Sequence, residues 1–319
     1  MRRRFRNAAA GAGARGDLKM PLDYVLVTPA RNEAAFVRRT LESVVAQTVL
    51  PKRWVVVSDG STDDTDAIVE EYRRGRSWLE LVRLPPRTER DFAAKARAVG
   101  IGYARVAPLA FDVVGNLDAD VSFGPDFMEY LLAKFAAMPR LGVASTYYRE
   151  GDFHSWRDSW ISETHVTGQV QLFRRDCFEE IGGYVPSRGG GVDWIAETTA
   201  RMKGWETRSF GERTFEHHRK SGTAGGSELR ARFDYGLKDW FLGGHPLWQL
   251  GRGAFQMTKR PYVVGGLGLL AGYAWGFVTR RERAVSDELT RFHRAEQLAR
   301  LRLLARRPLD AVRRASRAA

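Results

Sequence analysis

Three apolar runs, each ending in a polar cluster, constrain the fold of this chain more than any other feature. They lie at residues 24–28, 54–57 and 111–115, and a less regular run lies at 79–82. Helix-like segments follow at about 33–47, from 63 onward and at 91–106. Apolar runs without alternation are typical of strands that helices cover on both faces. The sequence therefore predicts an α/β domain with a mainly parallel sheet flanked by helices.

The start of the second helix has its own local signals. Ser61 or Thr62 can cap this helix, because short hydroxyl side chains accept hydrogen bonds from the first free N–H groups. Asp63 and Asp64 suit the positive N-terminal end of the same helix.

The polar clusters follow the strands directly, at Pro29–Glu33, at Ser58–Thr65 and at Asp118–Asp120. In open α/β sheets, ligands bind outside the carboxyl ends of the strands. Two carboxylates two residues apart suit a hard divalent cation, and such an ion can clamp a diphosphate. The alternative is that these acids only form turns or helix caps. Their shared position predicts a site for a nucleotide sugar or a similar diphosphate.

The ordered set of motifs resembles a family 2 glycosyltransferase, a nucleotide-sugar-dependent inverting enzyme with the GT-A fold. The matching pieces cover about residues 22–220 and are Pro29–Glu33, Ser58–Thr65, Lys95–Ala98, Asp118–Asp120, and Gly182–Tyr184 with the later Asp193. The resemblance implies substrate binding by Pro29, Ala30, Asn32, Glu33, Asp59, Lys95, Asp118 and Arg219, and a divalent cofactor, Mg²⁺ or Mn²⁺.

Individual roles in the donor site follow from the same resemblance. Asp59 would accept a hydrogen bond from the uracil ring, or else be a turn residue. Asp118 would meet the ribose or the metal, and Asp120 would bind the metal directly. Lys95 would lie near the nucleotide, although Ala94 replaces the Gly of the family segment and a solvated helix Lys is the alternative.

The resemblance also implies a catalytic base. Asp193 matches the family Asp that deprotonates the acceptor hydroxyl, but its neighbour is Val192 where the family has Glu. The preceding glycines at 189–191 predict a flexible loop of the kind that gates an acceptor. Asp193 can instead be the N-cap of a helix over 194–203. Glu197, one turn further on, is the fallback base.

A histidine and basic cluster lies at residues 216–220. One histidine can complete the metal shell, and we prefer His218 to His217 because it adjoins Arg219. Arg219 or Lys220 can hold the leaving diphosphate. A basic surface loop is the alternative. The processive-synthase signature Gln-x-x-Arg-Trp is missing after the base, which favours one transfer for each acceptor.

The formal net charge of +13 comes mainly from residues 1–20 and 279–319. No nucleic-acid motif accompanies this charge, so an anionic membrane surface is the expected partner. Residues 1–20 lack the long apolar core of a cleavable signal peptide and predict a disordered basic arm. The single cysteine, Cys177, excludes an internal disulfide and fits a reducing cytosol.

An uncharged segment at 261–278 is flanked by basic residues on both sides. An interfacial or re-entrant helix, a span, a buried helix and a homodimer interface are all compatible with it. Stretches at 233–257 and 289–304 predict amphipathic helices. We expect a basic arm at 1–20, a glycosyltransferase domain at 21–225 and a helical, membrane-associated region at 226–319.

These features predict a metal-dependent hexosyltransferase-type enzyme on the cytoplasmic face of the cell membrane. It would use a UDP-type sugar by default and a lipid-linked or cell-surface glycan acceptor, in cell-wall or exopolysaccharide synthesis. One alternative is a nucleotidyltransferase, which usually has a Gly-rich loop after the first strand, and residues 28–32 contain no Gly. Another is a non-catalytic glycan-binding protein, although the acids at 59, 118, 120 and 193 argue against it.

Overall fold

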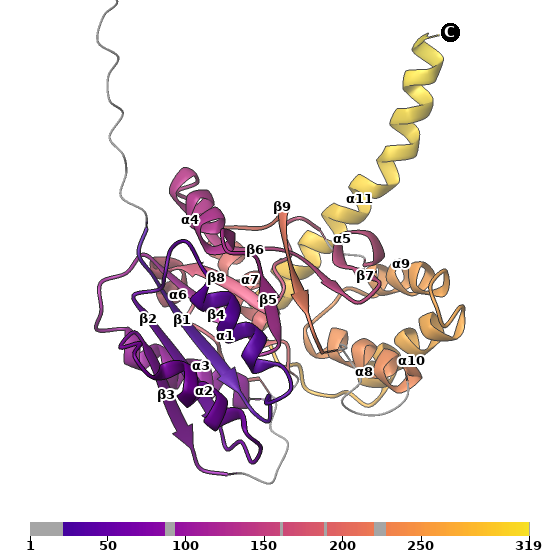
Figure 1. Cartoon of the computed structure of the whole chain (residues 1–319). Coiled ribbons are helices and arrows are strands. Elements are labelled where there is room, and N and C mark those ends of the chain that lie inside the picture. Colours follow the sequence, from indigo (N-terminus) through magenta and orange to yellow (C-terminus); the bar gives the residue numbers. More distant parts are fainter. Residues whose placement is uncertain (1–21, 87–92, 160–161, 188–189, 220–227, 319) are drawn as a thin grey trace, which may run out of the picture.

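The computed structural model describes residues 22–86, 93–159, 162–187, 190–219 and 228–318. Its centre is one mixed sheet in the order β3-β2-β1-β4-β8-β6-β9-β5, with β7 paired to β6 (Figure 1). The strands are β1 Tyr24–Ala30, β2 Arg53–Asp59, β3 Leu79–Leu84, β4 Val113–Leu117, β5 Val121–Phe123, β6 Leu141–Glu150, β7 Phe153–His154, β8 Val170–Arg174 and β9 Glu206–His217.

The first four strands of the sheet are all parallel, in the order β3, β2, β1 and β4. Beyond them β8 is antiparallel to both β4 and β6, β9 runs parallel to β6, and β5 is antiparallel to β9. The predicted α/β architecture with a largely parallel sheet is confirmed. All three predicted polar clusters follow strands of the parallel part.

Helices pack on both faces of the sheet. The core on one face includes residues of α1 Val37–Val45, α2 Thr65–Arg73 and α4 Phe127–Ala137. The core on the other face includes residues of α3 Ala94–Val106, α6 Arg175–Glu180 and α7 Val192–Met202. A short helix, α5 Ser155–Asp158, follows β7.

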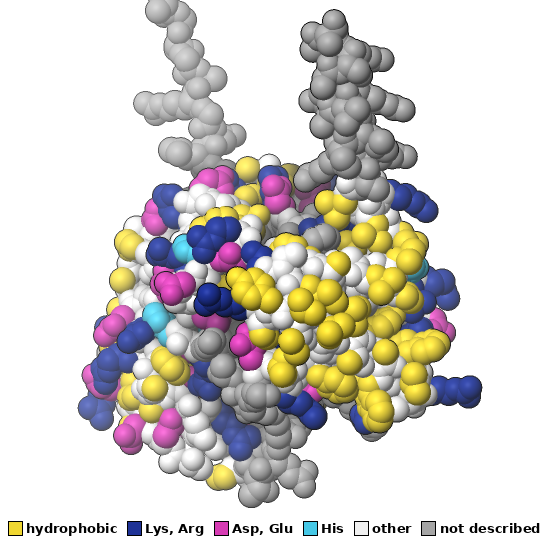
Figure 2. Space-filling view, turned by 90° about the vertical axis from the view of Figure 1, so that its right-hand side faces the viewer, with side chains coloured by type: hydrophobic (Ala, Val, Ile, Leu, Met, Phe, Trp, Pro, Cys, Tyr) yellow, Lys and Arg dark blue, Asp and Glu magenta, His cyan; other side chains and the backbone are white. Residues whose placement is uncertain are grey.

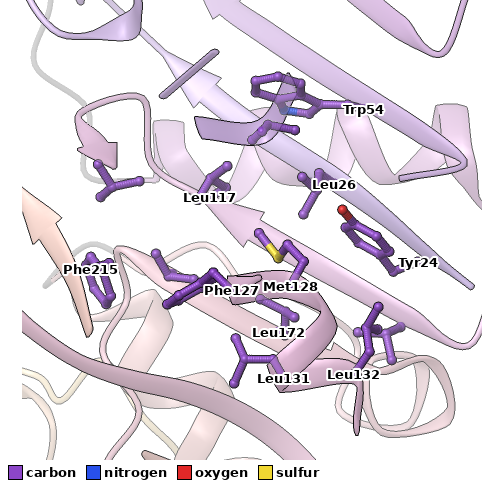
Figure 3. Packing of buried hydrophobic residues seen from close by; sticks show 14 of the residues in the cluster. Tyr24, Leu26, Trp54, Leu117, Phe127, Met128, Leu131, Leu132, Leu172 and Phe215 are labelled. Carbon is purple, nitrogen blue, oxygen red and sulfur yellow. The ribbon is translucent and has the colours of Figure 1, made fainter. Parts of the chain in front are cut away.

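Strand β1 shows why its apolar run has no alternation. Tyr24 and Leu26 are buried in the first core, and Val25 and Val27 are buried in the second, because successive side chains of a strand point to opposite faces. Figure 3 shows the first core, where Met128 and Leu131 of α4 lie over Leu26 and its neighbours in the sheet.

The loops after β1 and β2 are joined to each other by hydrogen bonds. The predicted cap by Ser61 or Thr62 is wrong: α2 begins after Asp64 and has no side-chain cap. Instead, the N–H of Thr62 donates to Asn32 Oδ1 at 2.8 Å, and the N–H of Asn32 donates to Ser61 Oγ at 3.2 Å. Asn32 has a left-handed backbone, with φ 54°, which turns the chain toward the second loop.

The predicted helical C-terminal region contains α8 Glu228–Phe241, α9 Pro246–Met257, α10 Val264–Val278 and α11 Asp287–Ala318. In Figure 1, α8, α9 and α10 lie together on the side of the molecule away from β3. Within the described residues, no helix has both the length and the apolar character needed to cross a bilayer.

The glycines of α10 allow its close contact with α8 and α9. A Cβ at Gly272 would lie 1.9 Å from the carbonyl oxygen of Phe233, and one at Gly266 would lie 2.4 Å from that of Gly253. Both obstacles are backbone atoms of neighbouring helices, so they cannot move aside as a flexible side chain can. The Gly-rich composition of the segment at 261–278 therefore reflects tight helix packing.

We predict that Gly272→Ala lowers the free energy of unfolding by about 1–3 kcal/mol, the usual cost of overpacking. Gly100→Ala in α3 is the matched control, because a Cβ there meets nothing within 4 Å and Ala is the better helix former. Urea denaturation of both variants measures the difference. Equal stability of the two variants would contradict the close packing of α10 on α8.

Candidate functional site

The carboxyl ends of β1 and β4 and the end of β9 meet at one place. Arg219, just after β9, forms ion pairs with Glu33, which follows β1, and with Asp120, which follows β4. The distance from Arg219 Nε to Asp120 Oδ2 is 3.3 Å. The guanidinium also lies over the ring of Phe36, 5.5 Å from its centroid. Three segments distant in sequence are thus joined through one arginine.

Asp118 and Asp120 have different surroundings although only one residue separates them. Lys95 Nζ lies 2.6 Å from Asp118 Oδ1. Burial raises the pKa of Asp118 to about 6, with the charge of Lys95 opposing and that of Asp120 adding to the rise. Burial also disfavours the charged form of Asp120, but the contacts with His217 and Arg219 outweigh it and lower its pKa overall. Asp120 is thus held ionised.

One oxygen of Asp120 lacks a hydrogen-bond partner. Asp120 is only 7% exposed, and its Oδ1 atom is buried without a partner among the described residues. A buried charged oxygen without a partner is costly, and native structures rarely keep one without a reason. Among the described residues nothing occupies this position, so the oxygen is available to a ligand.

The two adjacent histidines at the end of β9, His217 and His218, have different partners. His217 Nε2 lies 3.4 Å from Asp120 Oδ2, and His217 Nδ1 lies 2.7 Å from Glu150 Oε2. Burial lowers the pKa of His217, but the two carboxylates reverse this and raise it to about 9. His218 instead contacts Arg39 and Ser122 through its ring. The structure thus brings His217 to Asp120, so the geometry favours His217 over the predicted His218.

The predicted donor-binding residues of the first two loops lie at the same edge of the sheet. Pro29 and Ala30 are the last residues of β1 and pair with Val57 and Ser58 of β2. Asp59 is the last residue of β2. The next residue, Gly60, has φ 67°, and a Cβ added there would lie 2.7 Å from Pro86 Cα, so the position requires glycine. Burial and the charge of Asp120 raise the pKa of Glu33 to about 7, against the lowering effect of Arg219.

The predicted base Asp193 lies in the first turn of α7. Gly191, with φ 73°, is the N-cap of this helix, so the alternative that Asp193 is the N-cap is wrong. The Asp193 side chain lies against the backbone of Gly168, where a Cβ would come within 2.2 Å of its Oδ2 atom. Only glycine leaves room for the carboxylate at this approach.

The carbonyl of Gly168 links Asp193 to the acidic pair. It accepts hydrogen bonds from Lys95 Nζ at 2.9 Å and from Asn116 Nδ2 at 3.1 Å. Lys95 also contacts Asp118. It therefore lies between Asp118 and Gly168, the residue against which the Asp193 side chain packs. The structure brings together Lys95, Asp118 and Asp193, as the sequence predicted for a single site.

A second lysine acts on Asp193 from the C-terminal helices. Burial disfavours the charged form of Asp193, but the charges of Lys238 in α8 and of Lys95 outweigh it and lower the pKa of Asp193. Lys238 lies against the start of α7, since a Cβ at Gly191 would be 2.9 Å from Lys238 Cε. Sequence reasoning missed Lys238, and no local pattern around it signals this long-range contact.

Glu197 does not suit the fallback role of base. It is 1% exposed, and its two carboxylate oxygens accept hydrogen bonds from His165 Nδ1 at 2.6 Å and from the N–H of Val166 at 2.5 Å. Arg201 adds an ion pair at 3.7 Å and connects Glu197 to Glu296 of α11. Both oxygens of Glu197 are therefore buried and already hydrogen-bonded, which indicates a structural role for this residue.

The donor set fits a cation that is bound partly by its substrate. Within the described residues, no group of three or more His, Cys, Asp or Glu side chains has the arrangement of a metal cage. Mg²⁺ commonly binds one or two carboxylates and completes its shell with substrate phosphates and waters. Asp118 and the free Oδ1 of Asp120 supply such a partial set. Lys220, the alternative to Arg219, lies outside the described residues.

Comparisons with known proteins agree with this geometry. The family model described as "Glycosyl transferase family 2" matches residues 25–192, more than half of the chain. A glucosyl-dolichyl phosphate glucuronosyltransferase of Haloferax volcanii is 26% identical over 53% of this chain and 58% of its own. A 4,4'-diaponeurosporenoate glycosyltransferase of Staphylococcus aureus is 26% identical over 50% of this chain and 46% of its own length.

A poly-beta-1,6-N-acetyl-D-glucosamine synthase of Staphylococcus epidermidis is 28% identical over 36% of this chain and 26% of its own. The chain thus spans from about a quarter to just over half of the length of these relatives.

Two solved structures share the fold over most of the chain. The mannosyltransferase PcManGT from Pyrobaculum calidifontis, in complex with GDP-Man and Mn²⁺, gives a TM-score of 0.53 at 19% identity over 90% of this chain and 81% of its own. TarS of S. aureus gives a TM-score of 0.51 at 13% identity. The match covers 85% of this chain and 55% of the TarS chain. The predicted GT-A fold is confirmed by these similarities.

Proposed function

Because this chain belongs to glycosyl transferase family 2, we propose that it transfers a sugar from a nucleoside-diphosphate sugar to a lipid-linked or cell-surface glycan acceptor, with inversion at the anomeric carbon. The observation that carries the proposal is the position of Lys95 between Asp118 and Asp193. This position supports a site in which Asp118 acts on the donor side and Asp193 on the acceptor side, as a single displacement requires.

The donor side of the site is proposed from its charged residues and from the carboxylate oxygens that are available to bind a metal ion. Asp120 Oδ1 and Asp118 would hold Mg²⁺ or Mn²⁺, with His217 beside them. When bound, such an ion neutralises the charge that develops on the leaving diphosphate. Arg219 contacts Asp120 and would exchange part of this contact for a phosphate oxygen. Binding of GDP-Man and Mn²⁺ by the mannosyltransferase of similar fold supports this assignment.

The remaining donor contacts follow the strand ends. Asp59 at the end of β2 would accept a hydrogen bond from the nucleobase, and the backbone of Pro29 and Ala30 lies on the adjacent strand β1. Lys95 would bind the donor while keeping Asp118 ionised. UDP is the donor nucleotide that the family resemblance implies by default.

Asp193 is the proposed base on the acceptor side. Lys238 and Lys95 favour its ionised form, so its carboxylate is ready to take a proton at neutral pH. The acceptor hydroxyl gives its proton to the carboxylate while the oxygen attacks the anomeric carbon and the diphosphate leaves. The names of two relatives include a glucosyl-dolichyl phosphate and 4,4'-diaponeurosporenoate, which supports a lipid-like acceptor here.

We predict that Asp120→Asn abolishes the rise in melting temperature that a donor nucleotide causes in the presence of Mn²⁺. A ligand that binds only the folded state raises stability by mass action, and Asp120 supplies the free carboxylate oxygen for the ion. The measurement is a thermal-shift screen with UDP, GDP, dTDP and CDP, with and without Mn²⁺.

Asp126→Asn is the control for this screen, because Asp126 is an exposed acid paired with Arg213 away from the site. The control should keep the full shift of the wild-type protein. A normal Mn²⁺-dependent shift in Asp120→Asn would show that Asp120 does not bind the ion.

We predict that Asp193→Asn lowers kcat by about two to four orders of magnitude, the usual contribution of a general base. Donor affinity should stay near normal, because Asp193 faces Gly168 and not the acidic pair directly. Steady-state kinetics with saturating donor, together with nucleotide titration, separates the two effects. Reduced donor affinity with an unchanged kcat would refute the base assignment.

We predict that Lys238→Met shifts the acidic limb of the kcat–pH profile to higher pH. The ammonium of Lys238 lowers the pKa of Asp193, so its removal raises that pKa and leaves less ionised base at a given acidic pH. Lys203→Met, an exposed change at the far end of α7, is the control and should leave this limb in place. Coincident profiles for the two variants would contradict an effect of Lys238 on the base.

A further inference from the structure

Helix α10 has one apolar stripe that packs on neighbouring helices and a second that faces outward. Gly265, Gly266, Leu269, Gly272, Tyr273 and Gly276 are buried, at spacings of one, three and four residues. On the opposite side the large exposed side chains are Val264, Leu267, Trp275 and Val278, and Phe277 is exposed at the border of this stripe, where its ring also contacts Trp240 of α8. A helix that is apolar all round needs a partner on each side. We call the exposed stripe, with Tyr262 just before it, the α10 face.

The α10 face is large and continuous with other apolar surface. Trp275 is 50% exposed, Phe277 64% and Val278 72%, values that are high for such large apolar side chains. On α9, which packs against α10, Leu247 and Leu250 are also exposed. Figure 2 shows hydrophobic side chains gathered over this side of the molecule, with Lys and Arg side chains around their edges. Contiguous exposed apolar patches of this kind mark interaction sites.

Basic residues flank α10 at both of its ends. Residues 240–281 contain no Asp or Glu, while Lys259 and Arg260 precede α10 and Arg280 and Arg281 follow it. A partner that covers this face must therefore offer apolar surface bordered by negative charge. A second copy of the chain does not meet this requirement through the same face. In a two-fold dimer the basic ends of one α10 face would lie against the basic ends of the other.

We propose that the α10 face docks on the surface of an anionic lipid bilayer, with α10 lying in the plane of the membrane. The apolar stripe enters the region between headgroups and acyl chains, and the basic residues at both ends meet lipid phosphates. Tyr262 and Trp275 have the amphipathic rings that are enriched at this depth. The glycine stripe keeps α10 attached to α8 and α9, so the whole protein docks as one body.

This docking also positions the proposed acceptor side, a step that rests on the proposed function. α8 packs directly beneath α10, through Gly236 and Gly272, and carries Lys238, which acts on Asp193. One helix layer therefore separates the lipid surface from the proposed base. A lipid-linked acceptor could reach Asp193 without leaving the bilayer.

Vesicle flotation of the purified full chain tests the proposal independently of catalysis. The wild-type protein should float with vesicles of phosphatidylcholine and phosphatidylglycerol at low salt, and less with phosphatidylcholine alone or at high salt. Leu267→Gln/Val278→Gln removes two exposed apolar side chains of the α10 face and should weaken partitioning at least about tenfold. Leu50→Gln/Ile101→Gln is the matched control, since both residues are exposed elsewhere, and it should float like the wild type.

A second variant separates charge from apolar burial. Arg280→Gln/Arg281→Gln should reduce the preference for anionic vesicles while leaving the melting temperature unchanged. Failure of the wild-type protein to float with anionic vesicles would overturn the proposal, as would equal flotation of the α10-face variant and its control. If analytical ultracentrifugation instead finds a dimer that only Leu267→Gln/Val278→Gln dissociates, the face is a contact between copies of this chain.

Discussion

The site depends on balancing several carboxylates that are crowded between strand ends. Glu33, Asp118, Asp120 and Asp193 lie in or beside one partly buried region, and removing such groups from water is costly unless positive charge compensates them. Lys95 of α3, Lys238 of α8, and His217 and Arg219 at the end of β9 supply that charge. The compensation is therefore a property of the tertiary structure, and it holds β1, β4, β9, α3 and α8 around a common point.

Much of the fold follows from short-range patterns. The strands near 24, 54, 79 and 113 form where apolar runs and turn residues predict them, because burial on both faces leaves a clear signal. The ends of helices are less predictable. Ser61 and Thr62 have the chemistry of caps, yet Thr62 and Ser61 bond to Asn32 in the neighbouring loop instead. A tertiary partner has replaced the local one.

The strand-end residues of the site were predictable from sequence pattern, whereas Lys95 and Asp193, which lie on helices α3 and α7, were predicted only through the family resemblance. Asp118, Asp120 and Glu33 could be grouped because parallel strands end on one edge of a sheet. The distinction between His217 and His218 could not be made, since adjacent strand-end residues point to opposite sides and register decides which one meets Asp120. Gly168 and Lys238 had no signal at all, because their importance comes from contacts with Asp193 that are distant in sequence.

The charge balance also couples the binding of the proposed ligands to one another. A diphosphate that approached Asp118 and Asp120 alone would meet like charge at short range, where the surrounding protein screens it poorly. Arg219 offers only part of the compensation, because it already pairs with Glu33 and Asp120. We therefore expect nucleotide affinity and divalent-cation affinity to rise together, since each ligand supplies the charge that the other requires. Burial, and after it the charge of Asp120, raises the pKa of Glu33 to about 7, so a further negative charge next to Glu33 would be unfavourable without a compensating cation.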